Sequence, residues 1–141
     1  MRRLTLMLIL CAICGSCDKS DNRKATYPVT GVVRVDGQPV GQLAISCVSA
    51  TGLDKANPTV SAAFTDKEGA FKISTYEKGD GVPVGDYVLT VIWGQMNLLS
   101  MQYGGPDKLK GKYADPATST IKFTVKEGVP TDLGTNELTT K

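Results

Sequence analysis

"GDYVLTVIW", residues 85–93, is the stretch that most clearly indicates the fold class of this protein. Tyr87, Leu89, Val91 and Trp93 occupy alternate positions, and this period of two places them on one face of an extended chain. The stretch is also rich in β-branched and aromatic residues, which favour strands. We therefore predict a β-strand here, with one face buried.

The same period of two continues through most of the chain after its first 26 residues. Apolar residues alternate in six further segments, which are residues 27–35, 43–48, 60–65, 71–74, 121–126 and 131–138. Turn signals such as Asp36-Gly37 and Asp66–Gly69 separate them, and no segment has the period of an amphipathic helix. About seven short strands of this kind predict an all-β fold, a single β-sandwich with Lys and Thr on its outer faces.

Three motifs support this fold by resemblance. "VTGVVRVDGQPV" (29–40), "AFTDKEGAFKIS" (63–74) and "VPVGDYVLTV" (82–91) resemble the signatures of the carboxypeptidase regulatory-like domain, a transthyretin-like (prealbumin-like) sandwich. Gly41-Gln42-Leu43 departs from that pattern, in which Gly-Ala more often begins the second strand. Small bacterial envelope lipoproteins also resemble the sequence over its whole length, and they mostly lack an assigned activity. These motifs are structural, so the resemblance implies a fold and little about function.

The N-terminus has the three-part layout of a secretory signal peptide. Residues 1–3 are basic, residues 4–13 are apolar, and small residues follow, but the apolar run is far shorter than the roughly 20 residues that span a bilayer. Gly15-Ser16-Cys17 resembles the end of the bacterial lipobox, whose cysteine is acylated, for example with palmitate, and becomes the mature N-terminus. An aliphatic residue usually stands where this chain has Cys14.

These features predict a lipoprotein signal peptide at 1–16, a flexible tether at 17–26 and a β-sandwich domain at 27–141. The resemblance implies an exported protein anchored in a membrane through lipid on Cys17, facing the periplasm or the cell surface. Ordinary secretion after cleavage, with Cys17 as a free thiol, remains the alternative.

The cysteines also allow a metal interpretation, which the composition does not favour. Cys11, Cys14 and Cys17 have a spacing that could hold an iron–sulfur cluster, but the only other cysteine is Cys47 and the chain contains no histidine. Cys47 is in phase with Leu43, so we interpret it as a buried apolar side chain. We predict no metal and no cofactor.

The net charge of +2 comes from the predicted signal peptide. Without Arg2 and Arg3, the 16 basic side chains become equal in number to the 14 acidic ones. A nucleic-acid partner requires a positively charged face, so none is expected.

Catalysis at neutral pH usually needs histidine, an activated thiol or amine, or paired carboxylates. The acidic residues Asp36, Asp66, Glu68, Asp80 and Asp86 all fall at predicted turns, where aspartate caps its own backbone. We therefore predict a binding or structural module that is not an enzyme. A hydrolase that uses carboxylates alone, and a calcium-stabilised carbohydrate- or protein-binding module, remain alternatives.

Residues 94–119, "GQMNLLSMQYGGPDKLKGKYADPATS", form a connection that is long for a compact sandwich. Its apolar half could fold back and cap an open end of the sandwich. Alternatively, the segment could bind another envelope protein or a glycan. The candidate binding residues are Trp93, Tyr103, Lys108, Lys110, Lys112 and Tyr113.

Overall fold

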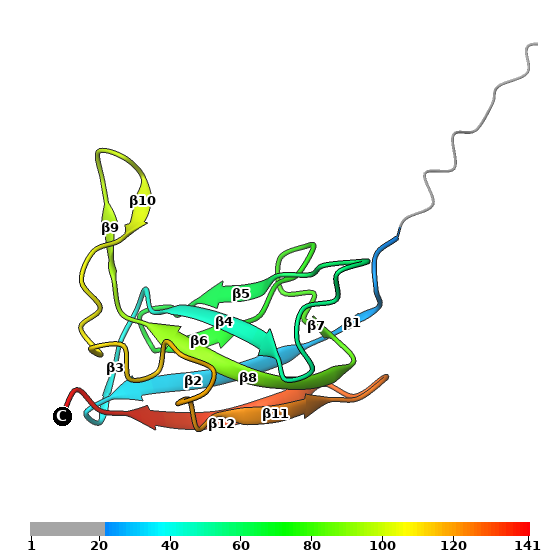
Figure 1. Ribbon diagram of the computed structural model, residues 1–141. Helices are drawn as coiled ribbons and strands as arrows, with labels where there is room; N and C mark the ends of the chain where they lie inside the picture. The colour runs from blue at the N-terminus through cyan, green and yellow to red at the C-terminus, as the bar shows by residue number, and fades with distance from the viewer. Residues whose placement is uncertain (1–21) are drawn as a thin grey trace, which may run out of the picture.

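The alternating stretch at 85–93 forms strand β8 (Gly85–Ile92), which lies inside the first of two facing sheets (Figure 1). The computed structural model describes residues 22–141, and this part of the chain contains twelve strands and no helix. The predicted signal peptide and Cys17 lie outside the described residues. Each of the seven segments predicted as strands overlaps an observed strand.

The first sheet has the order β11-β8-β4-β5 and is antiparallel throughout. Around β8 it contains β4 (Ala44–Ser49), β5 (Ser61–Phe64) and β11 (Lys122–Val125). The second sheet is built around β2 (Val29–Val35).

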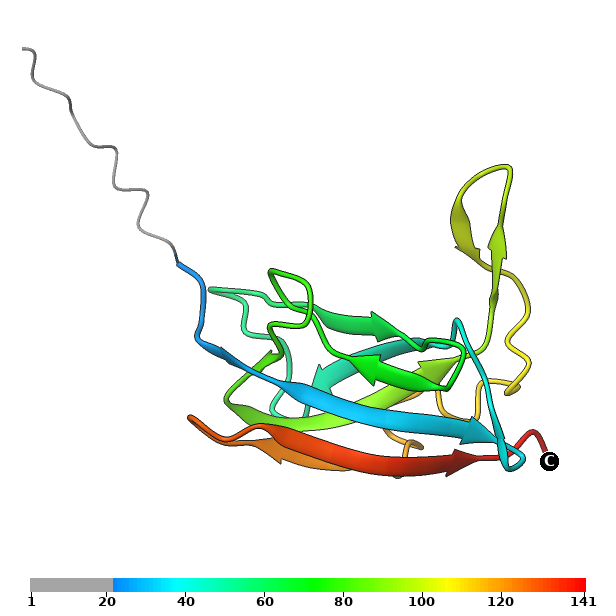
Figure 2. The same cartoon turned by 180° about the vertical axis from the view of Figure 1, so that it is seen from behind.

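In the second sheet, β2 has strands on both sides. The C-terminal strand β12 (Thr131–Leu138) runs parallel to it on one side. On the other side are β3 (Gln38–Pro39) and β6 (Ala70–Lys72), both antiparallel to it. Figure 2 shows this second sheet from its own side. The last strand of the chain therefore lies beside the first long one.

Four short strands lie outside the two sheets. β1 (Thr26–Tyr27) pairs with β7 (Val82–Pro83), close to where the described chain begins. β9 (Gln95–Asn97) and β10 (Gln102–Gly104) pair with each other in a hairpin that projects away from the sheets (Figures 1 and 2).

The core fills the space between the sheets, as the alternation predicts. Ile45, Leu89 and Val91 from the first sheet pack against Val33 and Phe71 from the second, and all five are buried. Removing this apolar surface from water is the main stabilising contribution to such a fold. The structure thus confirms an all-β, sandwich-like architecture.

The outer face of the first sheet is less polar than predicted. Val48, Phe64 and Ile92 point away from the core, and each is exposed to solvent. The expectation of Lys and Thr on the outside is therefore wrong for β4, β5 and the end of β8. Apolar residues at both odd and even positions in these strands give two apolar faces, and alternation alone could not show which one is covered.

The two predicted turns form as expected and depend on glycine. Asp36 and Gly37, with φ of 50° and 81°, close the two-residue turn between β2 and β3. In the second turn, the carboxylate of Asp66 accepts the N–H groups of Glu68 and Ala70 at 3.0 and 2.8 Å. Gly69 has a φ of +76°, and a Cβ atom there would lie 2.2 Å from the carbonyl oxygen of Val33.

A pair of alanine variants separates backbone strain from steric clash. Gly37→Ala should lower the free energy of unfolding by about 1–2 kcal/mol, because it adds only the cost of a left-handed residue. Gly69→Ala should lower it by roughly 3 kcal/mol or more, since its methyl group also collides with the β2 backbone. Urea unfolding of both variants tests this. Equal losses would show that the carbonyl of Val33 moves aside freely.

Cys47 lies in the first sheet opposite Leu89 and packs against the core, but it is only partly buried where full burial was predicted. Burial raises the pKa of its thiol from 9.0 to about 12. Between pH 9 and about 12, the thiol is therefore neutral in the folded protein and ionised in the unfolded chain.

This difference predicts a loss of stability at alkaline pH. Below pH 9 the contribution of the neutral thiol is fully present, and it should decline as the pH rises from 9 toward 12. Other groups can also change the stability at alkaline pH, so the quantity to measure, at each pH, is the unfolding free energy of wild type minus that of Cys47→Ala. A constant difference would contradict the prediction.

Candidate functional site

The long connection at 94–119 divides into two parts with opposite roles. Residues 95–104 form the β9–β10 hairpin, which projects into solvent, whereas residues 105–119 lie against the end of the sandwich (Figure 1). The expectation that the apolar half caps the core is therefore wrong. The half that carries the lysines does so instead.

Leu109 closes this end of the sandwich. Its side chain is 1% exposed and belongs to the core, and Tyr113 is buried beside the same core. Backbone hydrogen bonds fix the segment to the end of β8: Lys108 donates to the carbonyl of Trp93 at 3.0 Å, and Val91 donates to that of Tyr113 at 2.9 Å. We call residues 107–113 the plug.

A single carboxylate shapes the plug. One oxygen of Asp107 accepts the N–H groups of Trp93 and Leu109, each at 2.9 Å, and the other accepts that of Gly111 at 2.9 Å. The bond to Trp93 links the plug to the residue that follows β8. Asp107 therefore turns Leu109 toward the core and fixes the point from which the hairpin departs.

Tyr103 holds the base of the hairpin. Its hydroxyl accepts the N–H of Gly94 at 2.7 Å, and its one proton can go to the carbonyl of Gln42 at 2.9 Å or of Ile92 at 3.0 Å. Its ring packs edge-on against Phe64 of β5, with 5.1 Å between centroids. This residue, a predicted binding residue, thus connects the hairpin to both β8 and β5.

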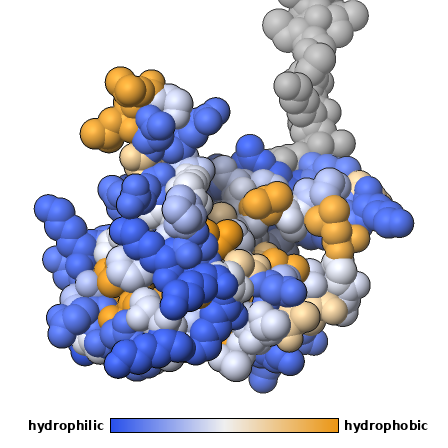
Figure 3. All heavy atoms as spheres, turned by 60° about the vertical axis from the view of Figure 1, so that its left-hand side comes forward, coloured by the Kyte–Doolittle hydropathy of each residue, from blue (hydrophilic) through white to orange (hydrophobic). Residues whose placement is uncertain are grey.

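The tip of the hairpin is apolar and exposed. Leu98 is 82%, Leu99 99% and Met101 75% accessible, and Figure 3 shows this cluster at the end of the projection. The turn itself is ordered by Asn97, whose side-chain oxygen accepts the N–H groups of Leu99 and Ser100 at 2.9 and 3.2 Å. The apolar side chains are therefore presented on a defined turn.

The other predicted binding residues do not form one surface. Tyr113 is buried, and its hydroxyl accepts the N–H of Thr139 at 3.2 Å. Lys108 is exposed with its ammonium 4.9 Å from the ring centroid of half-buried Trp93. Lys110 is also exposed.

The side chain of Lys112 lies beside the C-terminal residue Lys141. Its ammonium donates to the backbone carbonyl of Lys141 at 3.1 Å and lies 5.5 Å from the ring centroid of Tyr113. The six candidates therefore include two contacting pairs, Lys108 with Trp93 beside the hairpin and Lys112 with Tyr113 near the C-terminus.

The residues that sequence reasoning missed are Leu98, Leu99 and Met101. The available signal was the absence of any charged residue in 94–106, combined with Asn97 directly before a four-residue turn. A turn normally carries polar residues or glycine, so three apolar side chains in one are unusual.

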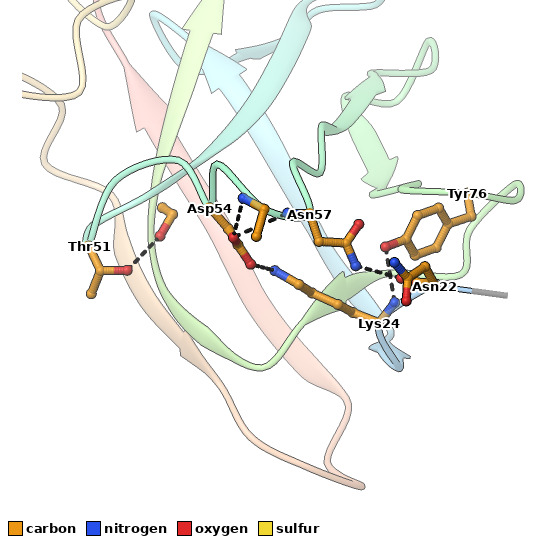
Figure 4. Close-up of polar contacts among 8 residues, drawn as sticks. Asn22, Lys24, Thr51, Asp54, Asn57 and Tyr76 are labelled. Carbon is orange, nitrogen blue, oxygen red and sulfur yellow. Dashed lines mark hydrogen bonds and ion pairs between the residues drawn. The ribbon is translucent and has the colours of Figure 1, made fainter. Parts of the chain in front are cut away.

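The N-terminal residues of the described chain contact the opposite end of the sandwich (Figure 4). The ammonium of Lys24 pairs with Asp54 at 2.6 Å, and its backbone N–H donates to the hydroxyl of Tyr76 at 3.1 Å. The side chain of Asn57 donates to the carbonyl of Asn22. Residues 22–24 fall in the predicted tether, and these contacts hold them to the domain.

The same contacts account for the charge state of Asp54. The hydrogen bond from Lys24, with those from the N–H groups of Asn57 and Ala56, holds the pKa of the Asp54 carboxyl below its usual value. The pair is exposed, so it positions the chain more than it stabilises the fold.

Several acidic residues cap turns, but the prediction that Asp36 and Asp86 do so is wrong: Asp36 accepts hydrogen bonds from Thr140, and Asp86 lies within β8 and accepts one from Thr124. Asp66 and Asp107 cap turns as above, and Asp115 accepts the N–H of Ala117 at 2.8 Å. Asp80 accepts the N–H groups of Thr75, Tyr76 and Glu77. Partial burial raises the pKa of Asp80, but these hydrogen bonds outweigh it and the net direction is down.

Two surface grooves accompany these features. One of about 990 Å³ lies between β5 and β6, lined by residues that include Ala62, Phe64 and Phe71. One of about 510 Å³ lies near the N-terminal residues, lined by Leu53 and Val60 among others. Within residues 22–141, no three His, Cys, Asp or Glu side chains come together as a metal site would require.

Comparison with known proteins gives little further information. No family model and no curated protein matches the chain. A 9R-lipoxygenase from Cyanothece PCC8801 is similar over 81% of this chain at 16% identity with a TM-score of 0.43, and the aligned part spans only 16% of that protein.

A second solved structure is the dioxygenase domain of a dioxygenase carbohydrate-binding protein fusion from Streptomyces sp. SirexAA-E. It is similar over 85% of this chain and 82% of its own length, at 15% identity and a TM-score of 0.38. Both scores are low, and we draw no argument from either likeness. In the part of the chain that the structure describes, no helix is long and apolar enough to cross a membrane.

Truncating two leucines of the 94–119 segment should separate its two parts. Leu109→Ala should lower the free energy of unfolding by about 2–5 kcal/mol, because it leaves a cavity in the core. Leu99→Ala, the matched control, should change it by no more than about 0.5 kcal/mol, because the side chain is in solvent. Denaturant titration measures both. A large loss for Leu99→Ala would mean that the hairpin folds onto the sandwich.

Proposed function

We propose that this protein is a lipid-anchored envelope protein whose sandwich acts as a binding module without enzymatic activity. The observation that carries the proposal is the hairpin tip, where Leu98, Leu99 and Met101 are exposed on a turn ordered by Asn97. An apolar cluster held away from the core has no structural role in the domain. Such clusters commonly mark contact sites.

The anchor is the second part of the proposal and follows from the sequence. The basic and apolar segments before Gly15-Ser16-Cys17 support export and acylation of Cys17. The protein would then face the periplasm or the cell surface. Its contacts would be with the membrane and with an envelope protein or a glycan.

The capping roles of Asp66, Asp80, Asp107 and Asp115 support a role other than catalysis. A catalytic carboxylate must be able to exchange protons with a substrate, whereas these accept hydrogen bonds from their own turns. We also propose that the domain is a transthyretin-like member of the carboxypeptidase regulatory-like group. The D-G and T-D-x-x-G turns described above support that assignment.

Metabolic labelling with an alkyne fatty acid tests the anchor. Wild type should take up the label and sediment with membranes. Cys17→Ala should take up no label and should be recovered in the soluble fraction. Cys14→Leu is the matched control, because it removes a neighbouring thiol and supplies the aliphatic residue that the lipobox usually has. Undiminished labelling of Cys17→Ala would refute acylation at this position.

A further inference from the structure

The geometry of the turn does not require the apolar side chains at the hairpin tip. Asn97 supplies the side-chain hydrogen bonds of the turn, and Met101 takes the left-handed conformation, with φ of 53°, that glycine or asparagine adopts more readily. Leu98 and Leu99 are almost wholly in solvent. No residue in 94–106 is charged. The tip is therefore suited to leave water for an apolar environment.

The hairpin is fixed to the sandwich at its base. The hydroxyl of Tyr103 bonds to the backbone of Gly94 and of Gln42 or Ile92, and its ring packs on Phe64. A base connected to both β8 and β5 gives the tip a defined direction. Figures 1 and 2 show that this direction takes it beyond the β5 edge of the sandwich.

The described N-terminus leaves the sandwich on the same side. Residues 22–25 also extend beyond the β5 edge, at the end opposite to the hairpin, in both views (Figures 1 and 2). Asn22 is held there by Asn57, and Lys24 by Asp54. Cys17 precedes Asn22 by five residues, which span at most about 18 Å when extended. Lipid on Cys17 would thus keep this end close to the bilayer.

Exposed apolar residues also occur between these two points. Val60 directly precedes β5, Phe64 ends it, and Leu53 lies in the loop that leads to it, and all three are exposed. At the other end, Lys108 and Lys110 are exposed a few residues after the hairpin, with Asp107 between, and the ammonium of Lys108 lies 4.9 Å from the ring centroid of Trp93 at the hairpin base. Lysines at the base of an apolar projection match the anionic headgroups that border an apolar bilayer interior.

From this geometry we propose that the β9–β10 hairpin inserts its tip, Leu98, Leu99 and Met101, into the bilayer that holds the Cys17 anchor. The protein would lie along the membrane with its β5 edge toward it, attached at both ends. This inference rests on the proposed anchor. A bilayer fits the convex tip because lipid needs no complementary groove, which another protein would have to provide.

The test uses the mature acylated protein, purified from membranes and reconstituted into vesicles of phosphatidylethanolamine and phosphatidylglycerol. The environment-sensitive fluorophore NBD is attached at Leu99→Cys, and at Glu127→Cys in the exposed turn after β11 as the matched control. Labelled wild type measures the background from Cys47, which burial keeps poorly reactive.

Insertion predicts opposite behaviour at the two positions. NBD at 99 should shift its emission to the blue, be quenched by spin-labelled lipid and be shielded from iodide, whereas NBD at 127 should remain open to iodide. Changing Leu98 and Met101 to serine in the labelled protein should return the fluorophore at 99 to water, because the tip loses its apolar surface.

The remaining outcomes are distinguishable. If the protein floats with the vesicles but position 99 behaves like position 127, insertion is wrong and the anchor stands. If position 99 is shielded from iodide but not quenched by spin-labelled lipid, another protein or a second copy of this chain covers the tip, and insertion into the bilayer is wrong. If the protein does not float at all, both the anchor and the insertion are wrong.

Discussion

The carboxylate of Asp107 is the constraint on which this end of the molecule depends. By accepting hydrogen bonds from Trp93, Leu109 and Gly111, it joins the end of β8 to the plug. The same bonds allow Leu109 to complete the core and fix the residue from which the hairpin leaves. One carboxylate thus positions both the buried Leu109 and the residue that leads into the hairpin. Without it, neither the closed end of the sandwich nor the direction of the hairpin would be defined.

The structure separates the parts that stabilise the fold from the part proposed to make contacts. The core is formed by side chains that alternate along paired strands and are buried between the two sheets. The hairpin pairs only with itself and touches the sandwich through Tyr103 and the chain at Gly94. Substitutions at its tip are therefore free to change what the protein contacts, because they leave the core packing unaffected.

The sequence allowed prediction of the parts whose physics is local. Alternation in β8 and the positions of the turns at 36–37 and 66–69 depend on neighbouring residues, and both were predicted correctly. The carboxylate of Asp36 instead bonds to the distant Thr140, which no local pattern indicates. Leu98 and Leu109 are the same residue type in one loop, and only a distant contact to β8 determines which is buried. The β9 and β10 strands are too short to show a period. The parallel pairing of β12 with β2 joins residues about a hundred positions apart, and nothing local indicates it.

That parallel pair has a consequence for how the chain matures. Val35 and Leu138 are neighbours in the second sheet, and both are buried, so the core is incomplete until the final residues are available. During synthesis, β2 can pair with β3 and β6 soon after it emerges, but its pairing with β12 must wait for about a hundred further residues. In the export that we propose, this late pairing would leave the second sheet open while the polypeptide crosses the membrane.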